Sequence, residues 1–479
     1  MRVKMRGIIP ILVIAIGLRL ATSVLLRNSA VDGLTVGYVE TAASLASGHG
    51  LLMNADGPSL IGGVSVLNTM QALEQKKERI DSSRPFPSST SRWIPATLHP
   101  PGYSLLLCGA YRLLNYSGMM VVAYGAQILA DSAVCLLLLW LGASLFTVQV
   151  GRGAAWIYAV LPPAVLNCAA LKPDALGPFF AVAILAVAAY EARSNVFRGI
   201  ATGLVVGMGV YFRSEILIFC AIVPALFVLY LPWRRALTLT LGVVVGVILA
   251  MTPWICWTYY KTGTPLVSTS NTGGGLYQAL GQDVDNPWGV SLDDGWMATV
   301  ANRAGFNNAW TPAASVYFRR LFIEAVREHP MDYVRLVIMH RLPNALAVPY
   351  DSEWLRQGRF TFASFKTNEG LGVEGVIMKY PMKVLRGMWA EAIMRFLALF
   401  LLCSVGYVCI TSRNGLWLAL PVFAVILSIC LLKYAEARNL CTILPAEALA
   451  VSVMLDNLFA GRTSGRRDYG RAVKSSSNR

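Results

Sequence analysis

Apolar runs of about twenty residues, separated by short polar turns, recur along most of the chain. A helix of that length can cross a hydrocarbon core that is about 30 Å thick. The first run extends from Ile8 to Leu26. We expect about ten membrane-spanning helices, at residues 8–26, 119–146, 150–170, 175–190, 200–212, 216–231, 237–257, 392–410, 416–432 and 441–460. The pattern therefore predicts an all-α polytopic membrane protein.

The first apolar run resembles a signal peptide, because the basic segment MRVKMR precedes it. However, the run is long, contains Arg19 and lacks a clear small-residue cleavage site. We interpret it as a retained first span.

Two long polar stretches, residues 27–118 and 258–390, separate the spans into groups. In the first stretch, Gln71 to Asp81 is rich in charge and predicts a solvated helix, and a Ser/Pro-rich irregular segment follows it. His99 to Asn115 then predicts a short apolar helix at the membrane interface. In the second stretch, apolar and basic residues alternate at helical spacing from Glu328 to Tyr350, which is typical of an interfacial helix.

Lys and Arg indicate which side of the membrane each turn faces, because cytoplasmic turns carry more of them. If the N-terminus is cytoplasmic, the same side holds Arg2, Lys4, Arg6, Arg152, Arg193, Arg198, Arg234, Arg235, Arg413, Arg462, Arg466, Arg467, Arg471, Lys474 and Arg479. The opposite short turns hold Lys172, Arg213, Lys433 and Arg438. We therefore expect both termini in the cytoplasm, both long loops outside, and a basic tail at residues 461–479 after a membrane domain at 1–460.

Composition supports this picture. The chain is 56% hydrophobic and 14% charged, with a mean hydropathy of +0.54, whereas charged residues make up about a quarter of a soluble protein. The net charge of +15 comes mainly from span ends and the tail, which favours anionic lipid over nucleic acid as the partner. The nine cysteines form no CxxC pair, so neither a disulfide framework nor a zinc site is indicated.

Two carboxylates follow the first span, Asp32 and Glu40. A carboxylate on an outward loop beside the lipid can act as a general base toward an acceptor that arrives from outside. The alternative is an ordinary solvated acid in a turn, because Gly33 follows Asp32.

Several motifs in this order resemble those of the GT-C membrane glycosyltransferases, in particular the group of the protein O-mannosyltransferases and the aminoarabinose transferase of lipid A. They are the acid after the first span with Tyr38, Glu40, Ala42 and Leu45, the GHG of 48–50, the HPPGY of 99–103, the RSE of 213–215, the PW of 253–254, the YYKTG of 259–263, the STSNTGG of 268–274 and the KYAEAR of 433–438.

The resemblance implies that a sugar, a hexose or a pentose, passes from a polyprenyl-phosphate donor to an acceptor hydroxyl with inversion, on the outer face of a bacterial cytoplasmic membrane. The acceptor would be a glycan, a lipid or a protein. Asp32 is implied as the base, but it lies further from Tyr38 than the acid of the family does, so Glu40 is a rival. Some relatives use a divalent cation, Mg²⁺ or Mn²⁺, although no metal-ligand spacing is visible here.

The resemblance also implies cations that stabilise the leaving phosphate, for which the candidates are Lys172, Arg213, Lys261 and Arg438. Each could instead extend toward lipid headgroups. Tyr38, His99, Asp174 and Glu215 complete the expected binding residues. The alternatives are a rigid loop exit for the histidine, a helix N-cap for Asp174 and a structural pair with Arg213 for Glu215. Asp131, inside the second span, is expected to bond to a neighbouring helix.

Two other functions are compatible with the sequence. A transporter or lipid flippase predicts charged or broken helices at mid-membrane and repeated halves, whereas the polar residues here gather in the outward loops. A catalytically inactive assembly subunit is the second alternative, because of the displaced acid.

Overall fold

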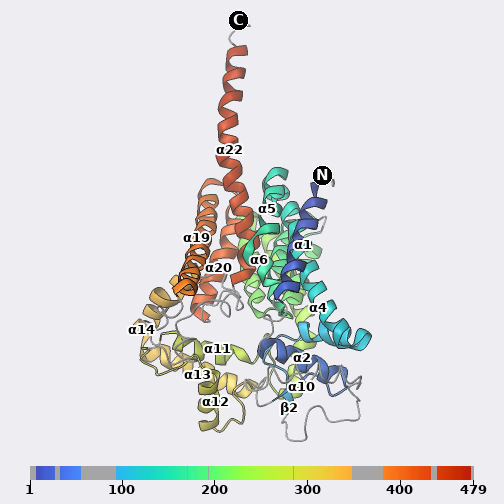
Figure 1. Ribbon diagram of the computed structural model, residues 1–479, viewed down its shortest axis with the longest axis vertical. Helices are drawn as coiled ribbons and strands as arrows, with labels where there is room; N and C mark the ends of the chain where they lie inside the picture. Colours follow the sequence, from blue (N-terminus) through green and yellow to red (C-terminus); the bar gives the residue numbers. More distant parts are fainter. Residues whose placement is uncertain are drawn as a thin grey trace.

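Helices make up nearly all of the regular structure in the computed structural model, which describes residues 7–26, 33–54, 93–169, 171–192, 194–283, 285–347, 381–432 and 440–475. Long helices run side by side in one bundle, and both termini lie at the same end of it (Figure 1). Shorter helices gather at the opposite end, which we call the outer end.

A helix occupies every one of the ten expected spans. The bundle consists of α1 (Ile9–Leu26), α4 (Gly102–Leu145), α5 (Val148–Val160), α6 (Pro162–Asn167), α7 (Leu176–Ala189), α8 (Asn195–Val210), α9 (Phe219–Tyr230), α10 (Trp233–Thr262), α19 (Pro381–Thr411), α20 (Leu416–Leu432) and α22 (Leu444–Ser475). Single turns of 3₁₀ helix precede three of them: η2 (Pro173–Ala175), η3 (Ser214–Ile218) and η6 (Cys441–Ile443).

Length and composition identify this chain as a multi-pass membrane protein. Within the described residues, three helical stretches are long and apolar enough to cross a bilayer by themselves, at Gly118–Leu145, Trp233–Thr262 and Cys441–Phe459, and six shorter apolar helices accompany them. The expected span at 150–170 is divided into α5 and α6, because Leu161 is extended before Pro162.

The outer end carries the two long loops. The first contributes α2 (Gly33–Ala46) and the strands β1 (Leu52–Asn54) and β2 (Trp93–Pro95), which pair antiparallel with Leu52 opposite Pro95. The second contributes α11 (Asn271–Gln278), η4 (Ala279–Gln282), α12 (Asp294–Arg303), α13 (Pro312–Glu328), α14 (Pro330–Arg335), the π-helix η5 (Leu336–Arg341) and α15 (Leu342–Ala347).

Three boundaries differ from the sequence-based expectation. The short helix expected at 99–115 is continuous with the second span, since α4 runs unbroken over 44 residues. Helix α10 extends to Thr262, where Gly263 ends it with a φ of 70°, and α19 begins at Pro381 rather than near 392. Hydropathy marks the part of a helix that faces lipid, so it misses helical turns beyond the bilayer. The helix expected at 328–350 is present as α14, η5 and α15, whereas the segments expected at 71–81 and 82–92 lie outside the described residues.

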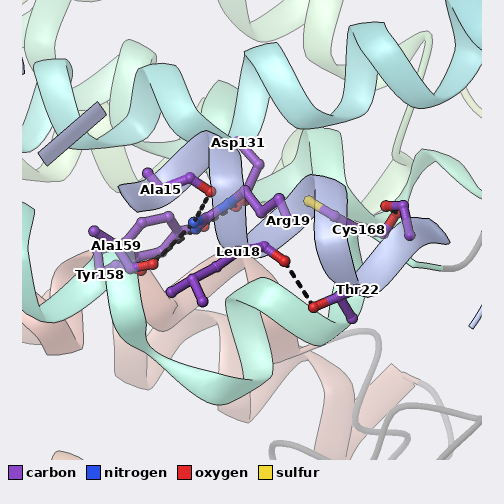
Figure 2. A network of polar contacts seen from close by, with 9 residues as sticks. Ala15, Leu18, Arg19, Thr22, Asp131, Tyr158, Ala159 and Cys168 are labelled. Carbon is purple, nitrogen blue, oxygen red and sulfur yellow. Dashed lines mark hydrogen bonds and ion pairs between the residues drawn. The ribbon is translucent and has the colours of Figure 1, made fainter. Parts of the chain in front are cut away.

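A buried ion pair ties the first span to the bundle (Figure 2). Arg19 Nε donates to Asp131 Oδ2 at 2.5 Å, and the Tyr158 hydroxyl donates to Asp131 Oδ1 at 2.6 Å. The other guanidinium nitrogens donate to the carbonyls of Ala15, Ala159 and Tyr158. Both charged side chains are 0% exposed. Asp131 of α4 thus binds α1 and α5 together, as a polar residue inside a membrane is expected to do.

Candidate functional site

Glu40 lies at the outer end on α2 and is 4% exposed. It faces a small hollow of about 20 Å³, whose wall comes from α2, β1 and the segment before α4. A space of this size holds about one water molecule. Burial raises the pKa of the Glu40 carboxyl from 4.5 to about 7. A carboxylate with a pKa near the working pH suits a general base.

Aromatic contacts hold the segment before α4 against α2. The ring of Tyr38 lies 5.1 Å from that of His99 and 5.3 Å from that of Tyr103, and Ser104 Oγ donates to the Tyr38 carbonyl at 3.1 Å. The Tyr103 hydroxyl donates to Gln127 Oε1 at 2.5 Å. His99 therefore lies beside Tyr38 and lines the same hollow as Glu40.

Gly102 explains how this segment reaches the bundle. Its N–H donates to the Tyr211 carbonyl at 2.7 Å, and a Cβ at this position would lie 2.5 Å from the same oxygen. The chain therefore needs glycine here. The contact brings the start of α4 against the end of α8, two residues before Arg213.

Three charged side chains form a second group, which we call the outer triad: Asp174, Arg213 and Glu215. Arg213 Nη1 donates to Asp174 Oδ1, and Arg213 Nε lies 3.3 Å from Glu215 Oε2. The three side chains are 4%, 8% and 11% exposed. Asp174 lies in η2 and Glu215 in η3, the turns in front of α7 and α9, and Arg213 directly precedes η3. Asp174 is not a helix cap, because Lys172 and Ala175 occupy the N-cap positions of η2 and α7.

The outer triad adjoins the Tyr38 contacts. Burial and, to a smaller extent, the charges of Tyr124, Tyr38 and Asp174 raise the pKa of Tyr103 well above its ordinary value. Leu171 and Leu176, on either side of Asp174, pack in the same hydrophobic cluster as Tyr38 and Tyr103. Lys172, in this turn, is 2% exposed. Residues from three distant parts of the sequence thus meet at one place.

A cavity of about 500 Å³ opens beside Glu215. Most of its wall surface is apolar, and hydroxyl, amide and carboxylate groups interrupt it. The lining residues are Ser214, Glu215, Leu217, Ile218, Cys220 and Ala221 from η3 and α9, Ser268, Thr269, Asn271, Thr272 and Gly275 around α11, and Ser428, Ile429 and Leu432 from α20. The volume falls in the range of pockets that bind small molecules.

A pair of hydroxyls separates the cavity from the hollow at Glu40. Thr97 Oγ1 donates to Ser270 Oγ at 3.0 Å, and the Ser270 N–H donates to the Thr97 carbonyl at 2.8 Å. The residues on either side of Thr97 line the hollow, and those on either side of Ser270 line the cavity. The two spaces are therefore neighbours.

The remaining sequence-predicted residues fall into two groups. Lys261 is exposed at the end of α10, where its Nζ lies 5.1 Å from the centre of the Tyr260 ring, so it does not join the outer triad. Asp32 and Arg438 lie outside the described residues.

The sequence analysis missed Glu447, which is 0% exposed near the start of α22. The sequence feature that could have identified it is an acidic residue inside the last apolar run. The sequence also gives no sign of most of the wall of the 500 Å³ cavity, because Ser and Thr residues occur in many turns and do not mark a binding site.

A divalent cation needs a set of oxygen or nitrogen ligands. Across the residues that the structure describes, no group of three or more His, Cys, Asp or Glu side chains is placed to hold a metal ion.

Comparison with known proteins supports the fold. No family model and no curated protein matches the sequence. The structure is similar to the archaeal oligosaccharyltransferase AglB from Archaeoglobus fulgidus in complex with an inhibitory peptide and a dolichol-phosphate, with a TM-score of 0.50, 13% identity, and coverage of 96% of this chain and 52% of that chain. A complex of the A. fulgidus oligosaccharyltransferase with Zn and sulfate gives a TM-score of 0.50, 10% identity, and coverage of 98% and 51%.

This chain spans about half the length of those structures. At such identities the likeness concerns the fold. The helical bundle has the fold of about half of the A. fulgidus oligosaccharyltransferase.

Proposed function

We propose that this protein is a membrane glycosyltransferase that moves a sugar from a polyprenyl-phosphate donor to an acceptor hydroxyl at the outer face of a bacterial cytoplasmic membrane. The observation that carries the proposal is the junction at the outer end, where a buried carboxyl with a pKa near 7 lies close to a mainly apolar cavity. The GT-C fold supports it, and the AglB structure named above holds a dolichol-phosphate.

The cavity suits a lipid-linked sugar because its wall is divided. Leu217, Ile218, Ile429 and Leu432 offer apolar contact to a prenyl chain, and the hydroxyls of the opposite side offer hydrogen bonds to a sugar. Helices α9 and α20 both belong to the membrane bundle, so a lipid-borne ligand would reach the cavity from the bilayer.

The proposed reaction is a single displacement. The acceptor oxygen bonds to the anomeric carbon of the sugar while the bond from that carbon to the phosphate oxygen breaks. A carboxylate takes the acceptor proton, and polyprenyl phosphate leaves with the bonding electrons. Attack opposite to the leaving group inverts the anomeric carbon.

Arg213 is already matched by two carboxylates, which suits it to holding Glu215 in place more than to binding phosphate. Lys172 and Arg438 stay candidates for stabilising the leaving phosphate.

Asp32 and Glu40 are the two candidate bases. Glu40 gains support from its place on the hollow beside His99 and from its raised pKa. If Glu40 is the base, the transfer rate falls as the pH drops below about 7, because the carboxyl becomes protonated. If Asp32 is the base and has an ordinary pKa, the rate persists to about pH 4.

The test is a transfer assay on membranes with radiolabelled polyprenyl-phosphate sugars, which compares Asp32→Asn and Glu40→Gln with Glu324→Gln. Glu324 is 45% exposed on α13 and pairs with Arg320, so it serves as the control. We expect loss of the base to reduce the rate by about 10²–10⁴-fold at normal expression. Full activity in both Asp32→Asn and Glu40→Gln would remove these acids from the mechanism. Solute flux without a covalent product would favour a transporter, and no donor turnover across several sugars would favour an assembly subunit.

A further inference from the structure

We propose that the acceptor binds between Thr97 and Ser270, and that the two outer loops separate at this pair to admit its hydroxyl group. This rests on the proposed function, with the donor in the cavity of about 500 Å³ and Glu40 as the base. Neither the fold nor the sequence motifs assign a place to the acceptor.

The space beside Glu40 is too small for an acceptor. Its volume is about 20 Å³, enough for about one water molecule, whereas pockets that bind small molecules measure about 300–1,000 Å³. Glu40 itself is 4% exposed. An acceptor hydroxyl therefore needs a wider space before it can donate a hydrogen bond to this carboxylate.

Transfer requires the base, the acceptor and the donor in one space. The base must lie within hydrogen-bonding distance of the acceptor hydroxyl, and the hydroxyl oxygen must lie about 3–3.5 Å from the anomeric carbon of the donor. Glu40 faces the hollow, whereas the donor would occupy the cavity. The acceptor hydroxyl must therefore bind where the two spaces meet.

Thr97 and Ser270 occupy this meeting point, and both are 1% exposed. Thr97 belongs to the first outer loop, between β2 and α4, and Ser270 belongs to the second, directly before α11. The neighbours of Thr97 in the sequence line the hollow, and those of Ser270 line the cavity. The pair is thus a partition between the two spaces, and each loop contributes one side of it.

The contact that forms the partition is modest. Hydrogen bonds of 3.0 and 2.8 Å join Thr97 and Ser270, and such bonds contribute little net free energy when water or a ligand can replace them. Trp310 of the second loop packs against a small apolar cluster of the first loop that includes Ala96 and Leu98. Because Ser270 Oγ donates to the Trp310 carbonyl at 2.6 Å, these two residues would move together.

A hydroxyl-bearing acceptor suits this place because a hydroxyl both donates and accepts hydrogen bonds. The Thr97 hydroxyl donates to Ser270 Oγ, and the Ser270 N–H donates to the Thr97 carbonyl. Separation of the pair leaves these donors and acceptors without each other, which is costly where water is scarce. The hydroxyls of the acceptor can replace both kinds of partner.

Access to position 40 tests the partition without any transfer step. The full chain with Glu40→Cys, in detergent, is treated with a small water-soluble methanethiosulfonate, and peptide mass spectrometry measures the rate of modification at this position. Thr97→Val removes the hydroxyl that binds Ser270 and keeps the shape of the side chain. It should raise the rate about two- to tenfold, because loss of one hydrogen bond favours separation. Thr299→Val, which removes a hydroxyl bonded within α12, should leave the rate unchanged.

A reversible cross-link tests whether transfer requires the separation. The two hydroxyl oxygens are 3.0 Å apart, so a disulfide can form in the double variant Thr97→Cys, Ser270→Cys. Oxidation should reduce transfer from radiolabelled polyprenyl-phosphate sugars about tenfold or more, because the reacting groups can no longer meet, and a reductant should restore it. Thr97→Cys alone, treated in the same way, controls for effects of the oxidant on the native cysteines.

Equal modification rates with and without Thr97→Val, or full transfer by the cross-linked protein, would overturn the proposal. The modification rates decide it even if the double variant does not cross-link. Because that measurement contains neither donor nor acceptor, a rate that responds to Thr97→Val in a protein without transferase activity would contradict the proposed function and leave the partition in place.

Discussion

At the scale of single residues, burial sets the chemistry of Glu40. A carboxyl that leaves water without gaining a cation binds its proton more tightly, because the charged form loses hydration. This loss of hydration is what raises the pKa of the Glu40 carboxyl. The loss of hydration that would let Glu40 act as a general base near neutral pH also means that its charged form destabilises the folded protein.

This linkage gives a prediction about stability. Between pH 4.5 and pH 7 the folded state holds a proton on Glu40 that the unfolded state has released, so this group lowers the free energy of unfolding as the pH rises. Glu40→Gln removes the effect and should be more stable than wild type by about 3 kcal/mol above pH 7, with little difference at pH 4. Thermal unfolding in detergent at both pH values measures it. A difference that is independent of pH would contradict the raised pKa.

The residues of the outer triad show what the sequence could and could not predict. The pairing of Arg213 with Glu215 was foreseen because only one residue separates them. The contact of Arg213 with Asp174, 39 residues earlier, was not, because it depends on how the turns before α7 and α9 meet. The sequence suggests either substrate binding or a helix cap for Asp174, and gives no sign that Arg213 is its partner.

At the scale of helices, glycine determines how closely α8 and α10 pack. A Cβ at Gly203 would lie 2.1 Å from the Val243 carbonyl oxygen, and one at Gly246 would lie 2.3 Å from that of Ile200. In a membrane, where lipid is as apolar as the helices, such close approach is a main source of attraction between them.

Gly203→Ala should therefore destabilise the protein by roughly 1–3 kcal/mol, because the two backbones must move apart. Gly17→Ala on α1 is the matched control, since a Cβ there meets nothing within 4 Å. The midpoint of thermal unfolding in detergent compares the two variants. If both have the same midpoint, the α8–α10 contact is looser than the structure indicates.

The existence of the helices followed from hydropathy, but the cavity did not. Its wall combines residues from 214–221, 268–275 and 428–432. Ser, Thr and Ala at these positions have no periodicity that distinguishes them from other turn residues. Only the approach of α9, α11 and α20 reveals that they face one space.

At the scale of the whole molecule, the two ends of the bundle differ in what they carry. Both termini lie at one end, and α2 and α11–α13 lie at the other (Figure 1). The Lys and Arg distribution predicts that the end with the termini faces the cytoplasm.

A matched pair of cysteine substitutions tests this orientation in a background where Cys256 and Cys403 are serine. Glu328 at the end of α13 and Glu191 between α7 and α8 are both exposed. An impermeant thiol reagent applied to intact cells should label Glu328→Cys and leave Glu191→Cys unlabelled until the cells are opened. The reverse pattern would place Glu40 and the cavity in the cytoplasm and contradict the proposed function.

The ion pair in the first span has a consequence for biosynthesis. Arg19 leaves the ribosome 112 residues before Asp131, so the nascent first helix meets the translocon with an unneutralised guanidinium. An arginine at the middle of an inserting helix costs about 2.5–3.5 kcal/mol. The nascent helix carries this cost until α4 emerges and Asp131 neutralises the guanidinium, so the ion pair is completed only when α4 has joined α1.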